Sequence, residues 1–152
     1  MNEKLTKERI YFTTALLNKS NEDKKLYHYK SVINLSNGLI SLNDSSSHYY
    51  FKEQMFDYFN LIKDSNYLIS QKESLMLYKK YILPIGQHLI KNNGFRTRSD
   101  IFKYIFVGVV LDFSIFFFLE KYYFIMTPIL FFIGYHKRKN KIKQNKFFSV
   151  FW

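Results

Sequence analysis

The 152-residue chain contains no cysteine, which excludes disulfide bonds, thiolate metal sites and cysteine nucleophiles. With only five glycines and two prolines, it also lacks the glycine-rich phosphate-binding loops and the nucleophile-elbow motif. The four histidines do not have the spacing of a metal site, so we expect ordinary surface or core residues at His28, His48, His88 and His136. We therefore assign no catalytic residue, no metal ligand and no cofactor, and expect a protein that is not an enzyme.

Acidic residues are rare in the last third of the chain. Residues 101–152 contain two Asp or Glu against eight Lys or Arg, whereas residues 1–100 contain ten against fifteen. The net charge of +11 is thus concentrated in one flank, which argues against a nucleic-acid partner. Such a flank suits anionic membrane lipids, at about 1 kcal/mol per base near the surface. The residues that we assign to lipid headgroups are Lys137, Arg138, Lys139, Lys141, Lys143 and Lys146.

Aromatic and apolar side chains are abundant, with 17 Phe and 13 Tyr. They concentrate in residues 101–135, IFKYIFVGVVLDFSIFFFLEKYYFIMTPILFFIGY, where the only ionisable side chains besides tyrosine are Lys103, Asp112, Glu120 and Lys121. A membrane-spanning helix needs roughly 20 apolar residues, so this block can supply one span or two short ones. Its apolar residues occupy every helical face, which a small domain cannot cover with protein. The sequence therefore predicts a segment surrounded by lipid.

Two charged residues divide this apolar block near its centre. Glu120 and Lys121 precede two tyrosines, a combination typical of a tight turn at the membrane interface. We therefore predict a transmembrane helical hairpin, with helices over residues 102–119 and 122–135. The second helix is short for a full crossing. A locally thinned bilayer, a Lys121 side chain that extends outward to the interface, or a hairpin that does not fully cross would each accommodate it, and one long span with an interfacial remainder is a further alternative.

The predicted organisation has three parts. Residues 1–98 form a cytosolic helical bundle, residues 99–136 the transmembrane hairpin, and residues 137–152 a basic, aromatic-ended cytosolic tail. The opening MNEKLTKERIYF has no apolar run, so we expect no cleaved signal peptide. Because Lys and Arg flank both ends of the hairpin, the positive-inside rule predicts that both termini face the cytoplasm.

The predicted fold class is all-α. Within the first hundred residues, apolar residues at helical spacing predict helices over about 4–18, 24–42 and 47–63, and a fourth that begins at Ser70. Ser70 and Glu73 form a capping box, Pro84 interrupts the fourth helix, and Gly94 ends it. The Asn37-Gly38 pair leaves a β-hairpin open as an alternative to the second helix. We expect the terminal KFFSVFW either to lie in the membrane interface or to dock on the folded part.

Asp112 is the one carboxylate in the stretch GVVLDFSIFFF, residues 108–118. A charge at bilayer depth costs about 2.5–3.5 kcal/mol on insertion scales, so Asp112 requires a polar partner. In an antiparallel hairpin, Thr127 can hydrogen-bond to it, while Pro128 frees the carbonyl of Phe124 as a further partner. We interpret the set as an intramembrane packing or assembly site, with a proton or ion site and a water-exposed position as alternatives. Its residues are Gly108, Asp112, Thr127, Pro128 and Gly134, the two glycines permitting close approach of the helices.

The last half of the chain resembles a group of small bacterial membrane-anchored proteins of uncharacterised function. The resemblance rests on LYKKYILPIGQHLIKNNGF, on the GVVLDF segment of the hairpin, and on a basic stretch with an aromatic terminus. It implies a C-terminal two-helix hairpin in the bacterial inner membrane, and it implies no reaction.

Two functions are compatible with these features. The first is a non-enzymatic accessory or adaptor protein that binds a partner protein through its cytosolic bundle and hairpin. The second is a membrane-active effector that forms a homo-oligomer through the hairpin and depolarises the membrane, or the immunity protein to such an effector.

Overall fold

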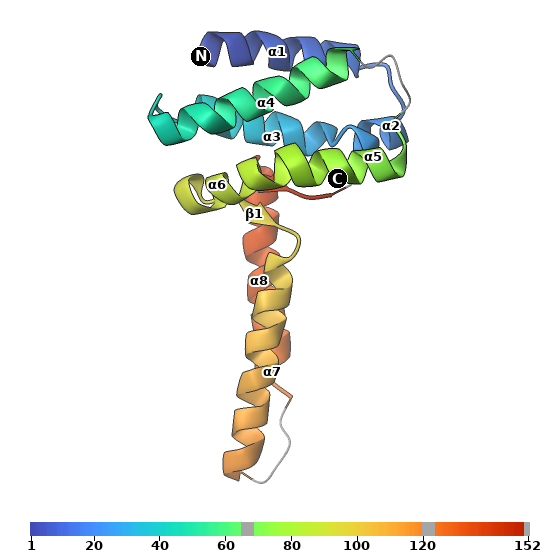
Figure 1. Ribbon diagram of the computed structural model, residues 1–152. Coiled ribbons are helices and arrows are strands. Elements are labelled where there is room, and N and C mark those ends of the chain that lie inside the picture. The colour runs from blue at the N-terminus through green and yellow to red at the C-terminus, as the bar shows by residue number, and fades with distance from the viewer. Residues whose placement is uncertain (65–68, 120–123, 151–152) are drawn as a thin grey trace. The chain divides into compact units, whose positions relative to one another are not determined.

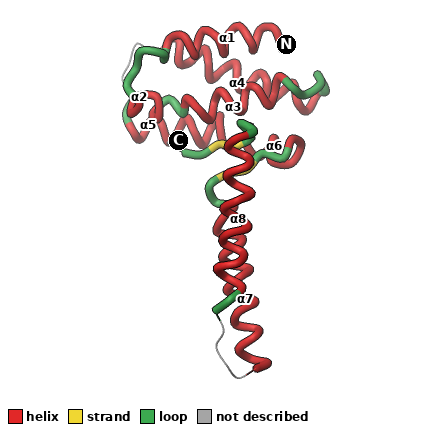
Figure 2. Tube along the Cα trace, turned by 180° about the vertical axis from the view of Figure 1, so that it is seen from behind, coloured by secondary structure: helices red, strands yellow, loops and turns green. Residues whose placement is uncertain are grey.

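The computed structural model describes residues 1–64, 69–119 and 124–150. Their regular secondary structure is helical apart from one pair of two-residue strands, so the all-α prediction is confirmed (Figures 1 and 2). The chain divides into two compact units, residues 1–95 with 148–152, and residues 96–147. Each unit is described below by itself.

The first unit is a helical bundle. In it α1 (Asn2–Ala15) packs against α3 (Tyr29–Ile40) and α4 (Ser46–Asp64), and α6 (Leu83–Asn93) packs against the same two helices. The most buried apolar side chains of the core, at most 2% exposed, include Val32, Leu35, Leu39, Met55, Tyr58, Phe59, Ile82 and Leu89, as the helical spacing predicts. The helical spacing after Ser70 also predicts Leu75 as a core residue, but Leu75 is 37% exposed, and Ser74 occupies the buried position of that turn. The elements are α1 (Asn2–Ala15), α2 (Asn21–Leu26), α3 (Tyr29–Ile40), α4 (Ser46–Asp64), α5 (Gln71–Leu77), η1 (Tyr78–Ile82) and α6 (Leu83–Asn93).

The predicted second helix is in fact two, because the chain breaks at His28. This residue has a left-handed backbone conformation (φ 50°) and is fully buried. Its Nε2 lies 2.8 Å from the carbonyl oxygen of Ser74, and its own carbonyl accepts the first hydrogen bond of α3 from Val32. A contact with a residue 46 positions away therefore holds the break, and no local glycine or proline signals it.

Asn37 and Gly38 lie inside α3, so the β-hairpin alternative is wrong at this position. Gly38 is required for packing instead. A Cβ atom built there would lie 2.8 Å from the ring of Phe95 and 3.0 Å from Leu89. Tertiary contact with the end of α6 thus outweighs the local turn signal.

The capping box at the start of α5 is confirmed. The Ser70 hydroxyl accepts from the N–H of Glu73, while Glu73 accepts from the N–H of Ser70 at 2.8 Å. The predicted interruption at Pro84 is a π-helical turn, η1, just before the proline, which stands in the first turn of α6. Because proline has no N–H to donate, a preceding carbonyl is freed, and that of Lys80 accepts from Gln54 at 2.8 Å. Gly94 ends α6 at φ 63°.

The C-terminal segment docks on the bundle, which is one of the two placements that the sequence left open. Phe148 is fully buried, and the hydroxyl of Ser31 both accepts from the N–H of Ser149 (3.0 Å) and donates to its carbonyl (2.9 Å). Phe148 fills the space beside Gly86, where a Cβ atom would lie 2.3 Å from the ring. Phe151 and Trp152 lie outside the described residues.

The substitution Gly86→Leu is expected to displace Phe148 and destabilise the bundle by about 2 kcal/mol, because the added side chain overpacks a full site. Chemical denaturation followed by circular dichroism gives the loss, and limited proteolysis reports release of the C-terminal segment. Gln87→Leu, at the exposed neighbouring position, adds a similar side chain and should change neither. A C-terminus of Gly86→Leu as protected as that of the wild type would refute this docking.

The second unit is an antiparallel pair of helices, α7 (Asp100–Leu119) and α8 (Met126–Lys143), which lie side by side in Figures 1 and 2. The strand before α7, β1 (Arg96–Thr97), pairs with the strand after α8, β2 (Phe147–Phe148). The first helix matches its prediction. The second was predicted over residues 122–135 but begins at Met126 and continues through the basic residues to Lys143. The predicted turn at Glu120 and Lys121 lies outside the described residues.

Candidate functional site

Helix α7 is the one element of the described chain that is long and apolar enough to cross a membrane. Residues 100–118 have a mean hydropathy of 2.0, and only 11% of them are buried. The 20 residues of α7 extend about 30 Å, the thickness of a bilayer core. Helix α8 does not qualify, since its apolar part ends near Tyr135. Of the two predicted spans, one therefore has the required length and composition.

Both helices of the second unit carry large apolar side chains on their outer surfaces. Those of α7 that are about half exposed or more include Phe102, Phe106, Val107, Val110, Phe113, Phe117 and Phe118, and those of α8 include Ile129 and Phe132. Water-soluble monomers rarely expose an apolar surface of this extent. The exposed parts of these side chains are thus the ones that need another apolar environment.

Asp112 lies on the inner side of α7, where it is 1% exposed. Its Oδ1 accepts hydrogen bonds from the backbone N–H groups of Ile125 (3.1 Å) and Met126 (2.8 Å). Its Oδ2 accepts from the N–H (2.9 Å) and the hydroxyl (2.6 Å) of Thr127. The carboxylate of one helix therefore caps the N-terminus of the next, where the helix dipole also favours a negative group.

This cap leaves the first turn of α8 without an unpaired donor. The first four N–H groups of any helix lack partners within it. Here Asp112 accepts from three of them, and the fourth position is Pro128, which has no N–H. The regular ladder starts with Ile129 donating to Ile125. Such complete pairing is what an apolar environment demands of a helix end.

Glycines allow the two helices to approach closely at two levels. A Cβ atom on Gly108 would lie 2.6 Å from the Cα of Thr127, and one on Gly134 would lie 2.8 Å from the ring of Tyr104. Helix interfaces in membranes commonly use small residues in this way. The four residues Gly108, Asp112, Thr127 and Pro128 thus gather at the start of α8, whereas Gly134 faces Tyr104 farther along.

Sequence reasoning found the Asp112–Thr127 hydrogen bond but missed most of the donors. The expected partner besides Thr127 was the carbonyl of Phe124, which requires Asp112 to donate. The carboxylate instead accepts in all four hydrogen bonds, and three of the donors are backbone groups. A helix start placed at residue 126 would have revealed them, because capping donors are fixed by where a helix begins.

The basic residues assigned to headgroups lie mostly on the last turns of α8. Lys137, Lys139 and Lys143 are exposed, whereas Arg138, Lys141 and Lys146 are half-buried. Two of these cations lie over aromatic rings: Lys137 Nζ is 5.4 Å from the centroid of Tyr104, and the guanidinium of Arg138 is 5.2 Å from that of Phe147. These two positive charges therefore contact aromatic side chains of the same unit.

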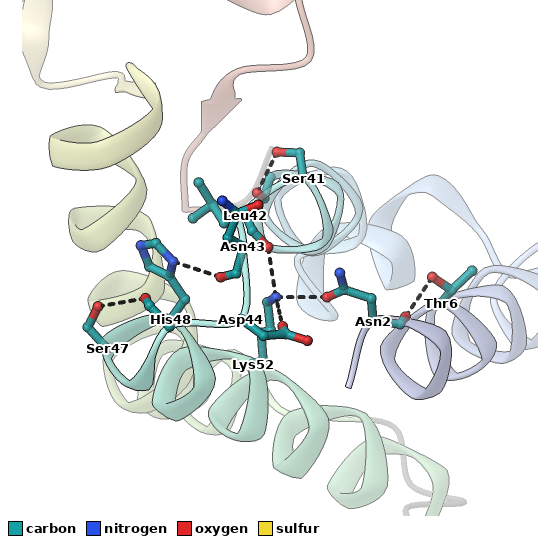
Figure 3. A network of polar contacts seen from close by, with 11 residues as sticks. Asn2, Thr6, Ser41, Leu42, Asn43, Asp44, Ser47, His48 and Lys52 are labelled. Carbon is teal, nitrogen blue, oxygen red and sulfur yellow. Dashed lines mark hydrogen bonds and ion pairs between the residues drawn. The ribbon is translucent and has the colours of Figure 1, made fainter.

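A second polar cluster lies in the bundle around Lys52, which is fully buried (Figure 3). Its Nζ donates to Asn2 Oδ1 (2.7 Å), to the carbonyl of Leu42 (2.9 Å) and to Asp44, so all three donors have acceptors. The hydrogen bond from Lys52 lowers the pKa of Asp44. This stabilising contribution is present above the ordinary aspartate range and is lost as the pH falls through the lowered pKa. Lys52 thus joins α1, α4 and the preceding loop, which is a structural role.

The substitution Lys52→Met should destabilise the bundle by about 2 kcal/mol, since it removes three charge-assisted hydrogen bonds and leaves the Leu42 carbonyl without the one that it accepts. The loss stays moderate because Asp44 is half exposed and rehydrates. Urea denaturation above pH 6 measures the change, with Lys72→Met as the exposed control. If both variants unfold at the same denaturant concentration as the wild type, the cluster does not have this role.

His28 and His88 pack in the bundle, whereas His136 is exposed. His28 is buried, and this burial lowers its pKa. His88 stacks on Phe51 with centroids 4.1 Å apart and lies against His48, and burial lowers its pKa as well. Within residues 1–64, 69–119 and 124–150, no group of three or more His, Asp or Glu side chains is placed to hold a metal ion.

Comparison with known proteins gives no family. No family model, curated protein or solved structure matches the chain.

Proposed function

We propose that this chain is a non-enzymatic membrane protein in which α7 and the apolar part of α8 insert into the lipid bilayer as a hairpin. The observation that carries the proposal is the combination on α7 of an outer surface that is almost entirely unburied and an inner acid whose hydrogen bonds are complete. Apolar side chains face outward and the buried carboxylate of Asp112 is paired, which is the arrangement expected of a segment surrounded by lipid.

The level of the membrane surface follows from the register of the hairpin. Tyr104 of α7 lies beside Gly134 of α8, and the basic residues begin three positions farther along α8. From Tyr104 to Leu119, α7 extends about 23 Å, somewhat less than a bilayer core of about 30 Å. We propose that Tyr104 and Lys137 lie at the interface and that the bases of α8 contact anionic headgroups.

The contacts of the hairpin favour an anchor over a pore. An oligomerising effector needs polar or small residues with which to contact other copies in the membrane. In this chain Asp112 has four donors within its own hairpin, and the spaces beside Gly108 and Gly134 are filled by Thr127 and Tyr104. We therefore place the chain among accessory or adaptor proteins of the bacterial inner membrane, with both termini cytoplasmic and the bundle available to a protein partner.

Affinity purification of the tagged chain from membranes in mild detergent tests the adaptor role. We expect a second protein in stoichiometric amount, and we expect overproduction to leave the membrane potential unchanged. A homo-oligomer without a partner, together with collapse of the potential, would contradict the anchor and favour the membrane-active effector.

A further inference from the structure

A pocket of about 190 Å³ lies in the bundle between α1 and α4. The two helices run parallel, because Asn2 bonds to Lys52 near their starts and Glu8 pairs with Lys63 nearer their ends. They lie side by side in both views, and their C-terminal ends are at the same end of the bundle (Figures 1 and 2). The pocket is at this end, and the structure describes every residue that lines it.

Aromatic side chains form much of the pocket wall. Phe12, Tyr27 and Phe59 are at most 4% exposed, whereas Tyr11 is 54% exposed. Ala15, the smallest of the lining residues, is exposed as well, so the pocket is apolar inside and reachable from solvent. An apolar cavity of about 150 Å³ is large enough to bind benzene. This pocket therefore has room for a six-membered ring with a short substituent.

The charged residues of the pocket leave one positive charge without a counter-ion. Glu8 and Lys63 neutralise each other, with Nζ of Lys63 2.6 Å from Oε2 of Glu8 and 4.6 Å from the ring centroid of Tyr11. The third charged residue, Lys19, is exposed, and its ammonium group has no side-chain partner in the part of the chain that the structure describes. A ligand with a negative group would complement this charge.

We propose that the pocket binds a small arylalkyl carboxylate, with the ring between the aromatic walls and the carboxylate beside Lys19. Aromatic rings gain from edge-to-face and offset contacts with one another beyond the area that they bury. Pockets for small molecules typically combine such apolar walls with a few polar groups that fix orientation. The bundle would then be a ligand-binding domain as well as a surface for a protein partner. All residues of the site belong to the bundle, so the assignment does not rest on membrane insertion.

Titration of the full-length protein in detergent micelles with 3-phenylpropionate tests the site. The methyl resonances of Leu16 and Ile62, which line the pocket, should shift and saturate, and should show nuclear Overhauser contacts to the ring of the probe. The uncharged 3-phenylpropionamide has the same size and should bind about threefold more weakly, the effect of one exposed charge pair. In Lys19→Gln the two probes should bind equally.

Two further variants separate the pocket from the rest of the surface. Ala15→Leu fills the space between the helices and should abolish the saturable shift, and its exposed position leaves the core intact. Thr14→Leu introduces the same side chain at the preceding exposed residue, which does not line this pocket, and should bind as the wild type does.

Four results would overturn the assignment. Absence of a saturable shift in the wild type would mean that the pocket binds no such compound, and unchanged binding in Ala15→Leu would place the probe elsewhere. If the amide bound the wild type as tightly as the acid, the site would not select an anion. If Lys19→Gln kept the preference for the acid, Lys19 would not be its partner.

Discussion

Replacement of Asp112 by leucine is expected to destabilise the helical hairpin by about 3 kcal/mol. The variant keeps a side chain of similar size but removes the acceptor of the Ile125, Met126 and Thr127 N–H groups, which are held away from water. Each unsatisfied buried donor costs about 1–3 kcal/mol, and the relief from burying a charge offsets part of the sum. The direct measurement is amide hydrogen exchange in detergent micelles, where these three amides should lose protection in Asp112→Leu.

Two further variants separate the cap from general effects on the helix. Asp112→Asn retains one acceptor oxygen, so it should lie between the wild type and Asp112→Leu. Ser114→Leu introduces the same side chain two positions along α7, at an exposed position, and should leave the protection of residues 125–127 unchanged. If Asp112→Leu protected these amides as well as the wild type does, the capping role would be wrong.

Replacement of Phe113 by arginine is expected to lower membrane insertion of the hairpin by about 3 kcal/mol, or about a hundredfold in the partition ratio. Phe113 is 50% exposed and lies about 13 Å along α7 from Tyr104, near the middle of the bilayer in the proposed placement. From this depth the guanidinium reaches the headgroups only in part. The ratio of membrane-bound to soluble chain, measured after synthesis in the presence of vesicles, gives the effect.

Two control variants show whether Phe113 faces lipid. Phe113→Leu keeps the residue apolar and should insert as the wild type does. Met76→Arg introduces the same charge at a residue of the bundle that is 62% exposed and should not change insertion. Phe113→Arg inserting as well as Met76→Arg would mean that α7 does not face lipid at this position.

Periodicity and composition were sufficient to predict the all-α class and the extent of most helices. Core residues such as Leu35 and Met55 recur at the spacing that buries one helical face, and the spacing of Ser70 and Glu73 identified a helix start. The apolar composition alone predicted a helix over residues 102–119, and α7 spans Asp100–Leu119 in the structure. These signals are local, so the sequence carries them without knowledge of the fold.

The remaining features depend on contacts between distant residues. The break at His28 relies on Ser74, the fit of Phe95 beside Gly38 relies on the packing of α6, and the late start of α8 relies on the cap from Asp112. None of these has a signature within a window of a few residues. The set around Asp112 was predicted because a charge in an apolar block requires a partner, but that requirement does not say which atoms donate.

Sedimentation of the full-length chain without detergent tests the central claim most directly. Membranes from cells that produce the chain are washed with alkaline carbonate and collected by ultracentrifugation. The proposed insertion of the hairpin predicts that the chain stays in the pellet and is released only by detergent. Recovery of the chain in the supernatant as a stable monomer would contradict it.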